Sequence, residues 1–216
     1  MGHNHVFLCG AVNRERGVAL MPQTPSGGLS GLETLLKQQQ ATGGHPPVER
    51  WNPPYCGDIG MRIAGDGTWF YQGSPIGRKP LVKLFASVLR KDEDGRTYLV
   101  TPVEKVDVAI DDAHFLAVEL SNEGQGRDQV LAVRTNVDDI VVIDSAHPLR
   151  FGVDPRSGGL KPYLLMRGRL EALFIRARYY DLVELSAVED SQLGVWSSGV
   201  FFPMAAAAGL EGLAQK

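Results

Sequence analysis

The stretch MRIAGDGTWFYQGSPIGRKPLVKLFASVL, residues 61–89, is the part of the chain that most clearly indicates its fold. Apolar residues on either side of a glycine-rich turn predict two strands, Met61–Ala64 and Thr68–Tyr71. Pro80 is suited to the first turn of a helix, because its missing N–H would have no partner there. Leucine, valine and phenylalanine then recur at helical spacing, so we predict a helix over Lys79–Arg90.

A second stretch repeats this order of elements in outline. It reads LRFGVDPRSGGLKPYLLMRGRLEALFIRARYYDLVEL, residues 149–185, and in it Arg150 aligns with Arg62. A helix predicted over Arg169–Leu185 aligns with the first helix, and TYLVTPVEKVDV aligns further on with LGVWSSGVFFPM. We therefore predict an α+β fold of two structurally similar repeats, each a small curved antiparallel sheet with one helix.

The same patterns divide the chain into segments. Ser30 to Glu33 fits a helix capping box, whereas the residues before it hold few periodic apolar positions. Translation could begin at Met1 or at Met21. The predicted segments are a disordered extension (1–27), a short helix (28–44), a first repeat (45–112), bridging strands (113–144), a second repeat (145–203) and a tail (204–216). Further strands are predicted over Tyr98–Thr101, Lys105–Ile110, His114–Leu120, Gln129–Thr135, Asp139–Ile143, Leu149–Val153, Pro162–Met166 and Val195–Phe202.

Composition indicates a soluble globular protein. Of its 216 residues 44% are hydrophobic and 22% are charged. The net charge of −3 argues against bulk attraction to nucleic acid. The sequence contains no run of 18 apolar residues, so we predict no membrane-spanning helix. The two cysteines are Cys9, in the extension, and Cys56, so we expect no structural disulfide and a cytoplasmic location.

The motifs of common enzyme classes are missing from the sequence. It holds no G-x-S-x-G elbow, no C-x-x-C or H-E-x-x-H pattern and no Walker sequence. His114, in HFLAVEL, is interpreted as a strand residue, whereas His147 before Pro148 could join a polar site. We therefore expect no catalytic residue, no metal site and no cofactor.

Two predicted helices begin with cations, although the helix dipole is already positive at that end. Arg78 and Lys79 precede the first helix, and Arg167 with Arg169 precedes the second. An anion would reverse the sign of this interaction, because free N–H groups, the dipole and a guanidinium all favour phosphate or carboxylate. The alternative is that these side chains turn into solvent or pair with acids such as Asp138, Asp139 or Glu104.

The segment RTNVDD, residues 134–139, is the densest polar set in the chain. Its side chains could hydrogen-bond a sugar or the edge of a base. The alternative is a hairpin turn, since Asn and Asp favour turns for local hydrogen-bonding reasons. We predict that Arg78 belongs to an anion site shared with Arg134 and Asn136.

Long phrases of the sequence resemble a bacterial family catalogued as domain-of-unknown-function family 1285. They are WNPPYCGDIGMRIAGDGTWFYQGSPIGRKPLVKLFASVLRKDEDGRTYLVTPVEKVDV, RTNVDDIVVIDSAHPLRF, PYLLMRGRLEALFIRARYY and LGVWSSGVFFP, and together they span roughly residues 45–203. The resemblance implies a duplicated α+β fold, a C-terminal half loosely like pleckstrin-homology barrels, and a cleft between the halves for a nucleotide-like ligand. It also implies a role in signalling, and it carries no catalytic activity.

The resemblance implies four candidate ligand-binding segments in this chain: GSPIGRK, TPVEK, RTNVDD and HPLRF. Together with the second group of cations they give the candidate residues Arg78, Lys79, Glu104, Lys105, Arg134, Asn136, Asp138, Asp139, His147, Arg150 and Arg167.

Three functions fit these observations. The first is a non-catalytic protein that binds a small anionic or nucleotide-like ligand between the repeats. The second is an enzyme that uses Glu104, Asp138 or Asp139 as acid or base on such a ligand. The third is an adaptor whose pleckstrin-like half binds a protein or peptide. Cations at predicted helix starts, without a nucleophile or a metal set, favour the first.

Overall fold

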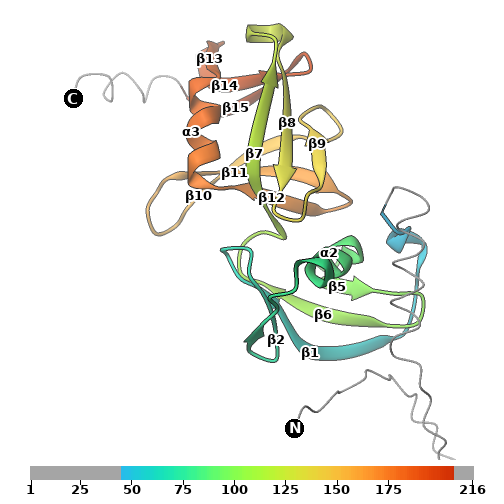
Figure 1. Ribbon diagram of the computed structural model, residues 1–216. Helices are drawn as coiled ribbons and strands as arrows, with labels where there is room; N and C mark the ends of the chain where they lie inside the picture. Colours follow the sequence, from blue (N-terminus) through green and yellow to red (C-terminus); the bar gives the residue numbers. More distant parts are fainter. Residues whose placement is uncertain (1–44, 207–216) are drawn as a thin grey trace, which may run out of the picture.

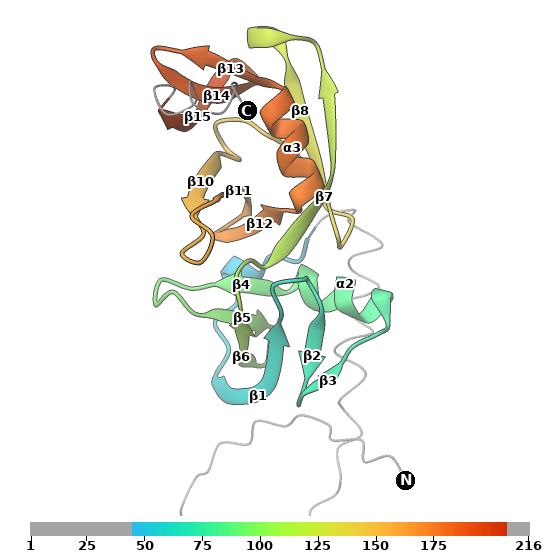
Figure 2. The ribbon, with the colours of Figure 1, turned by 90° about the vertical axis from the view of Figure 1, so that its left-hand side faces the viewer.

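The computed structural model describes residues 45–206. Figures 1 and 2 show two bodies that stack on one another, an N-terminal half (residues 45–113) and a C-terminal half (residues 114–206). The disordered extension and the short helix predicted before residue 45 lie outside the described residues. Of the predicted tail (204–216), the first three residues belong to the last strand of the structure and the rest lie outside the described residues. Among the described residues, no helix combines the length and the apolar character that a membrane span requires.

The N-terminal half is a six-stranded sheet with one helix. A 3-10 turn, η1 (Val48–Arg50), precedes it, and the strands follow the order β3-β2-β1-β6-β5-β4 across the sheet. Its elements along the chain are β1 (Tyr55–Ile63), β2 (Trp69–Tyr71), β3 (Ser74–Pro75), α2 (Lys79–Ser87), β4 (Leu89–Lys91), β5 (Thr97–Val100) and β6 (Lys105–Ile110).

Helix α2 begins where the sequence predicts it and ends earlier. Arg78 is the N-cap residue and Pro80 lies in the first turn. Leu84 and Ala86 are buried, and the ring of Phe85 stacks on that of Trp69 with 6.2 Å between centroids. The helix ends at Ser87 because the next residues pair as β4 with β5, which needs extended backbone.

The C-terminal half holds two sheets and one helix. A six-stranded sheet has the order β10-β11-β12-β7-β8-β9, and a three-stranded sheet has the order β13-β14-β15. The elements are β7 (Phe115–Glu123), η2 (Gly126–Asp128), β8 (Val130–Thr135), β9 (Ile140–Val142), β10 (Leu149–Val153), β11 (Leu160–Arg167), β12 (Leu170–Phe174), α3 (Arg176–Glu184), β13 (Ser186–Glu189), β14 (Gln192–Ser197) and β15 (Val200–Ala206).

Strands β7, β8 and β9 were predicted to bridge the two halves, and the structure places them elsewhere. They pair with one another, and β7 pairs with β12, so all three belong to the C-terminal sheet. The sheets are also mixed where antiparallel sheets were predicted. One parallel pair occurs in each six-stranded sheet, β1 with β6 and β12 with β7.

The long helix predicted over Arg169–Leu185 is wrong in its first third. Arg167, Gly168 and Arg169 form the turn between two antiparallel strands, β11 and β12. Leu170, Ala172 and Phe174 are buried and alternate with less buried residues, which is the period of a strand. The helix α3 begins only at Arg176, so no helix starts beside Arg167.

The order of elements nevertheless repeats. β1-β2-β3-α2-β4-β5-β6 in the first half corresponds to β10-β11-β12-α3-β13-β14-β15 in the second. In each series the first strand lies beside the last, as a hydrogen-bonded parallel pair in one (β1 and β6) and in contact in the other (β10 and β15). The helices therefore align as α2 with α3.

Candidate functional site: a polar pocket between the halves

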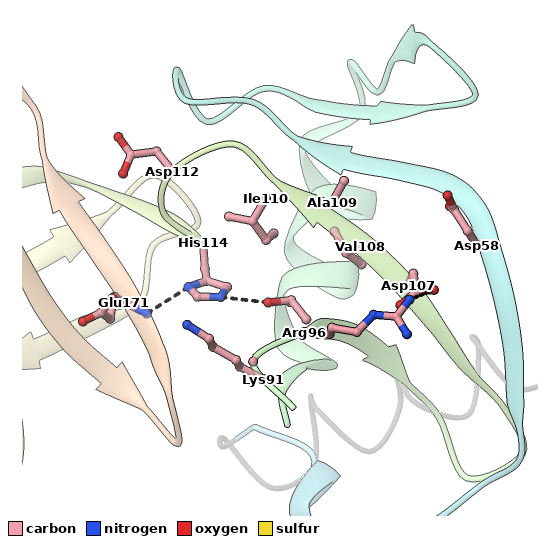
Figure 3. Close-up of a pocket in the computed structure, with 12 residues that line it drawn as sticks. Asp58, Lys91, Arg96, Asp107, Val108, Ala109, Ile110, Asp112, His114 and Glu171 are labelled. Atoms are coloured by element: carbon pink, nitrogen blue, oxygen red, sulfur yellow. Dashed lines mark hydrogen bonds and ion pairs between the residues drawn. The ribbon is translucent and has the colours of Figure 1, made fainter. Parts of the chain in front are cut away.

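A pocket of about 470 Å³ lies where the two halves meet (Figure 3). The β4–β5 hairpin and β6 of the N-terminal half form one wall, and the connection between β6 and β7 together with strand β12 contributes the other. Its charged and titratable lining residues are Asp58, Lys91, Arg96, Asp107, Asp112, His114 and Glu171. This size and a convergence of polar groups are typical of small-molecule sites.

His114 joins the two walls of the pocket. Its Nδ1 accepts a hydrogen bond from the backbone N–H of Glu171 at 3.1 Å, so the ring proton lies on Nε2. Nε2 then donates to the Oγ1 of Thr97, 3.0 Å away in the other half. The ring is only 4% exposed, and this burial lowers the pKa of His114 to about 4, so the imidazole is neutral at pH 7.

Most acids around the pocket already have partners. The guanidinium of Arg150 contacts both carboxylate oxygens of Glu171, at 2.5 and 2.6 Å. Asp107 accepts from Arg96 at 2.5 Å. Asp112 forms an ion pair with Lys161 and accepts a hydrogen bond from the Tyr163 hydroxyl at 2.7 Å. Asp58 is the exception: it forms no ion pair among the described residues and accepts only the backbone N–H of Gly60, at 2.7 Å.

Lys91 is a cation of the pocket that belongs to none of these ion pairs. It is half-buried and lines the pocket, and Figure 3 shows its side chain directed toward the ring of His114. Within residues 45–206 its ammonium makes no ion pair or hydrogen bond. The positive charge of Lys91 also helps to lower the pKa of His114. An unneutralised ammonium in a partly buried pocket is suited to an anionic ligand.

The predicted site residue Arg167 serves the contact between the halves. It is half-buried, and its Nη1 lies 2.9 Å from the Oδ2 of Asp139. Its Nη2 donates to the carbonyl of Ala86 at the end of α2, across the domain boundary. The guanidinium also lies over the ring of Phe115, 5.2 Å from its centroid. Burial lowers the pKa of Arg167, and the negative end of the α2 dipole favours this cation.

The RTNVDD segment contacts helix α2 through Asp138, a predicted site residue, and Lys83. Asp138 pairs with Lys83 of α2, and Arg134 is held by Glu119 and Asp138 at 2.7 and 2.8 Å. Asn136 accepts from the backbone N–H of Leu116 at 3.0 Å, which makes it a structural residue of the turn.

The cations that begin α2 stay in solvent. Arg78 and Lys79 are exposed, and neither forms an ion pair within the described part of the chain. No contact there joins Arg78 to Arg134 or to Asn136. Both alternatives that the sequence leaves open allow exposed cations here, so the anion site at the start of α2 stays a prediction.

The other candidates lie apart from one another. Lys105 pairs with Asp92 at 3.0 Å, and the Nδ1 of His147 contacts the carbonyl of Leu165 at 3.2 Å. Glu104 lines a separate, apolar cavity. Of the eleven candidates, Arg150 alone contacts a residue that lines the interdomain pocket within residues 45–206.

Sequence reasoning missed Lys91, His114 and Glu171. Lys91 precedes the turn DEDG, His114 has the pattern of a strand residue and Glu171 falls in a stretch predicted as helix. No spacing in the sequence links them, because tertiary packing brings together residues up to 80 positions apart.

The fold and the pocket define a class: a two-domain α+β protein, mostly sheet, with a polar pocket at the domain boundary. Residues 46–113 match the family model described as Domain of unknown function (DUF1285), N-terminal domain. Residues 114–204 match the model described as Protein of unknown function (DUF1285), C-terminal domain. The chain belongs to the DUF1285 family.

Two solved structures are similar to the chain. A DUF1285 family protein from Silicibacter pomeroyi DSS-3 is 50% identical, with a TM-score of 0.76, and the alignment covers 82% of this chain and 97% of that one. A DUF1285 family protein from Shewanella baltica OS155 is 28% identical, with a TM-score of 0.46 and coverage of 58% and 91%. No curated protein matches the chain at a significant level.

Proposed function

We propose that this protein is a non-catalytic binding protein that holds a small phosphorylated or nucleotide-like anion between its halves and acts in signalling. The observation that carries the proposal is Lys91, a half-buried ammonium without a partner among the described residues, in a pocket lined by both halves. A ligand there would contact both domains, so its binding would change the stability of the contact between them. Coupling of this kind is what a signalling role requires.

The arrangement favours binding over catalysis. Glu104 lines a different cavity, while Asp138 and Asp139 pair with Lys83 and Arg167. These three carboxylates do not share a pocket, so they are poorly placed to act together as acid and base. His114 does line the pocket, but both of its ring nitrogens already form hydrogen bonds, to Thr97 and to the backbone of Glu171.

The proposal extends to the origin of the fold. We propose that the two halves descend from one duplicated unit, and the repeated order β-β-β-α-β-β-β supports this. A pleckstrin-homology-like character of the C-terminal half stays a prediction.

Thermal shift with a panel of nucleotides and inorganic phosphate tests the binding proposal. A ligand that binds only the native state stabilises it by about 2.7 kcal/mol at a hundred times its dissociation constant. We expect at least one phosphorylated compound to raise the melting temperature of the full chain. Lys91→Met should weaken that binding at least tenfold, because it removes the unneutralised charge and keeps the apolar stem.

Arg156→Met is the matched control. It removes one exposed cation, in the loop between β10 and β11, that does not line the pocket. Equal losses in both variants would mean that general charge attraction, rather than this pocket, binds the anion. If no compound in the panel shifts the wild-type protein at millimolar concentration, the proposal fails.

A further inference from the structure

A second cavity, of about 310 Å³, lies inside the N-terminal half between α2 and the sheet. Leu81, Leu84 and Phe85 line it from the helix, and Met61 and Val106 line it from the strands. It shares no lining residue with the interdomain pocket. The volume is within the range of small-molecule sites, and such sites are mostly apolar with a few placed polar groups.

Strands β1 and β6 contribute different residues to the two cavities. Successive side chains of a strand point to opposite faces of the sheet. Near the start of β6, Val106 lines the apolar cavity and Asp107 the interdomain pocket, and in β1 Ile59 and Asp58 divide in the same way. Further along β6, residues 108–110 all line the interdomain pocket. A substitution in the lining of one cavity therefore leaves the lining residues of the other unchanged.

One charged side chain, that of Glu104, lines the apolar cavity. Its position is held by the turn between β5 and β6, where Thr101 Oγ1 accepts from the Glu104 backbone N–H at 3.1 Å. The residue is half-buried, and its carboxylate has no hydrogen-bond or ion-pair partner among residues 45–206. Burial alone raises the pKa of Glu104, since no neighbouring charge opposes it.

We propose that this cavity is a binding site for an apolar amine, with the hydrocarbon body between α2 and the sheet and the ammonium group on Glu104. A partly buried carboxylate without a partner costs free energy, and a ligand ammonium would supply the missing charge and hydrogen bonds. A ligand with the same body and a carboxylate would place two like charges together. The cavity should therefore discriminate by the sign of the head group.

Isothermal titration of the full chain with three probes of equal chain length tests the site: n-octylamine, n-octanol and n-octanoate, each kept below the concentration at which it forms micelles or separates from water. We expect octylamine to bind at least tenfold more tightly than octanoate. Glu104→Gln should reduce the affinity for octylamine at least fivefold and leave that for octanol within twofold. Leu81→Phe, which adds volume at the cavity wall, should weaken the binding of all three.

Glu123→Gln is the control, because Glu123 is exposed at the end of β7 and lines neither cavity. Its effect on octylamine should be less than twofold. The proposal is overturned if octanoate binds as tightly as octylamine, or if Glu104→Gln changes nothing. It is equally overturned if no probe binds the full chain at millimolar concentration, because the cavity is then closed to ligands.

Discussion

His114 governs how the contact between the halves responds to acid. An unfolded chain binds a proton on histidine near pH 6.5, whereas burial lowers the pKa of His114 to about 4 in the folded protein. Between these values the unfolded state binds more protons, so the free energy of unfolding falls as the pH falls. The contribution of His114 to stability is complete above pH 6.5, and about 3 kcal/mol of it is lost by pH 4.

The prediction at this scale concerns His114→Gln. A glutamine amide is uncharged at every pH, so the variant should lose less stability than the wild type between pH 6.5 and pH 4. Urea unfolding at several pH values measures both slopes, and their difference isolates His114 from the carboxylates that titrate in the same range. Parallel slopes would show that His114 does not carry the acid sensitivity.

Helix α2 is an element with unfavourable charge at its start. Arg78 occupies the N-cap without a side-chain hydrogen bond to the helix, and no acidic residue lies in the first turn. The N-cap position favours Asp, Asn and Ser, whose side chains accept from free backbone N–H groups. The exposed guanidinium therefore costs a little stability and has no compensating partner in the described chain.

Arg78→Asp should raise the free energy of unfolding by roughly 0.5–1 kcal/mol, through the cap and the helix dipole. Chemical unfolding measures the change, and part of the gain should disappear in 1 M salt because screening weakens the dipole term. A fall in stability would instead mean that Arg78 neutralises a carboxylate, and that the charge at the start of α2 is not unfavourable.

At the scale of the whole molecule, Arg167 connects the two halves. Its guanidinium joins Asp139 of its own half to the Ala86 carbonyl of the other. Arg167→Met should destabilise the protein by on the order of 3 kcal/mol, because it leaves Asp139 without its main partner. Arg167→Lys should recover little, since an ammonium cannot bridge the two acceptors in the geometry of a guanidinium. Thermal unfolding checks both variants, and separate transitions for the two halves would show a loosened contact.

Arg169 supplies the control within the same turn. It also reaches across the boundary, to Glu93 at 3.1 Å, but both side chains are exposed, by 53% and 90%. A pair of this kind contributes about 0–1 kcal/mol, so Arg169→Met should change stability little. Equal losses at the two positions would refute a special role for Arg167.

Prediction from sequence succeeded where the determining interactions are local. Helix α2 begins at Lys79 as predicted because Pro80 and the apolar spacing act within a few residues of each other. Strand β2 (Trp69–Tyr71) likewise follows from its own composition and the turn before it. Such signals are properties of short stretches, so they can be read without knowledge of the rest of the chain.

Prediction failed where the apolar residues of one stretch fit both the period of a helix and the period of a strand. LEALF, residues 170–174, fits an amphipathic helix and a half-buried strand almost equally well. Pairing of β12 with both β11 and β7 decides for the strand, because the backbone hydrogen bonds of a central strand need partners on both sides. The turn at Gly168, with φ at +52°, follows from that pairing.

Local sequence accounts for the type of many elements, since caps, prolines and apolar periods act over a turn or a hairpin. It did not give their number: the strand predicted over Val195–Phe202 is two strands, β14 and β15, joined by a turn. The order of strands across the sheets, the parallel pairs and the pocket of Lys91, His114 and Glu171 depend instead on residues tens of positions apart. Such contacts form because one packing of the elements buries the apolar surface better than the others. A short stretch of sequence does not show which packing that is. For this reason the sequence pointed to adjacent cations at the start of α2. The pocket that the fold builds instead combines Lys91 of β4, His114 of the connection before β7 and Glu171 of β12.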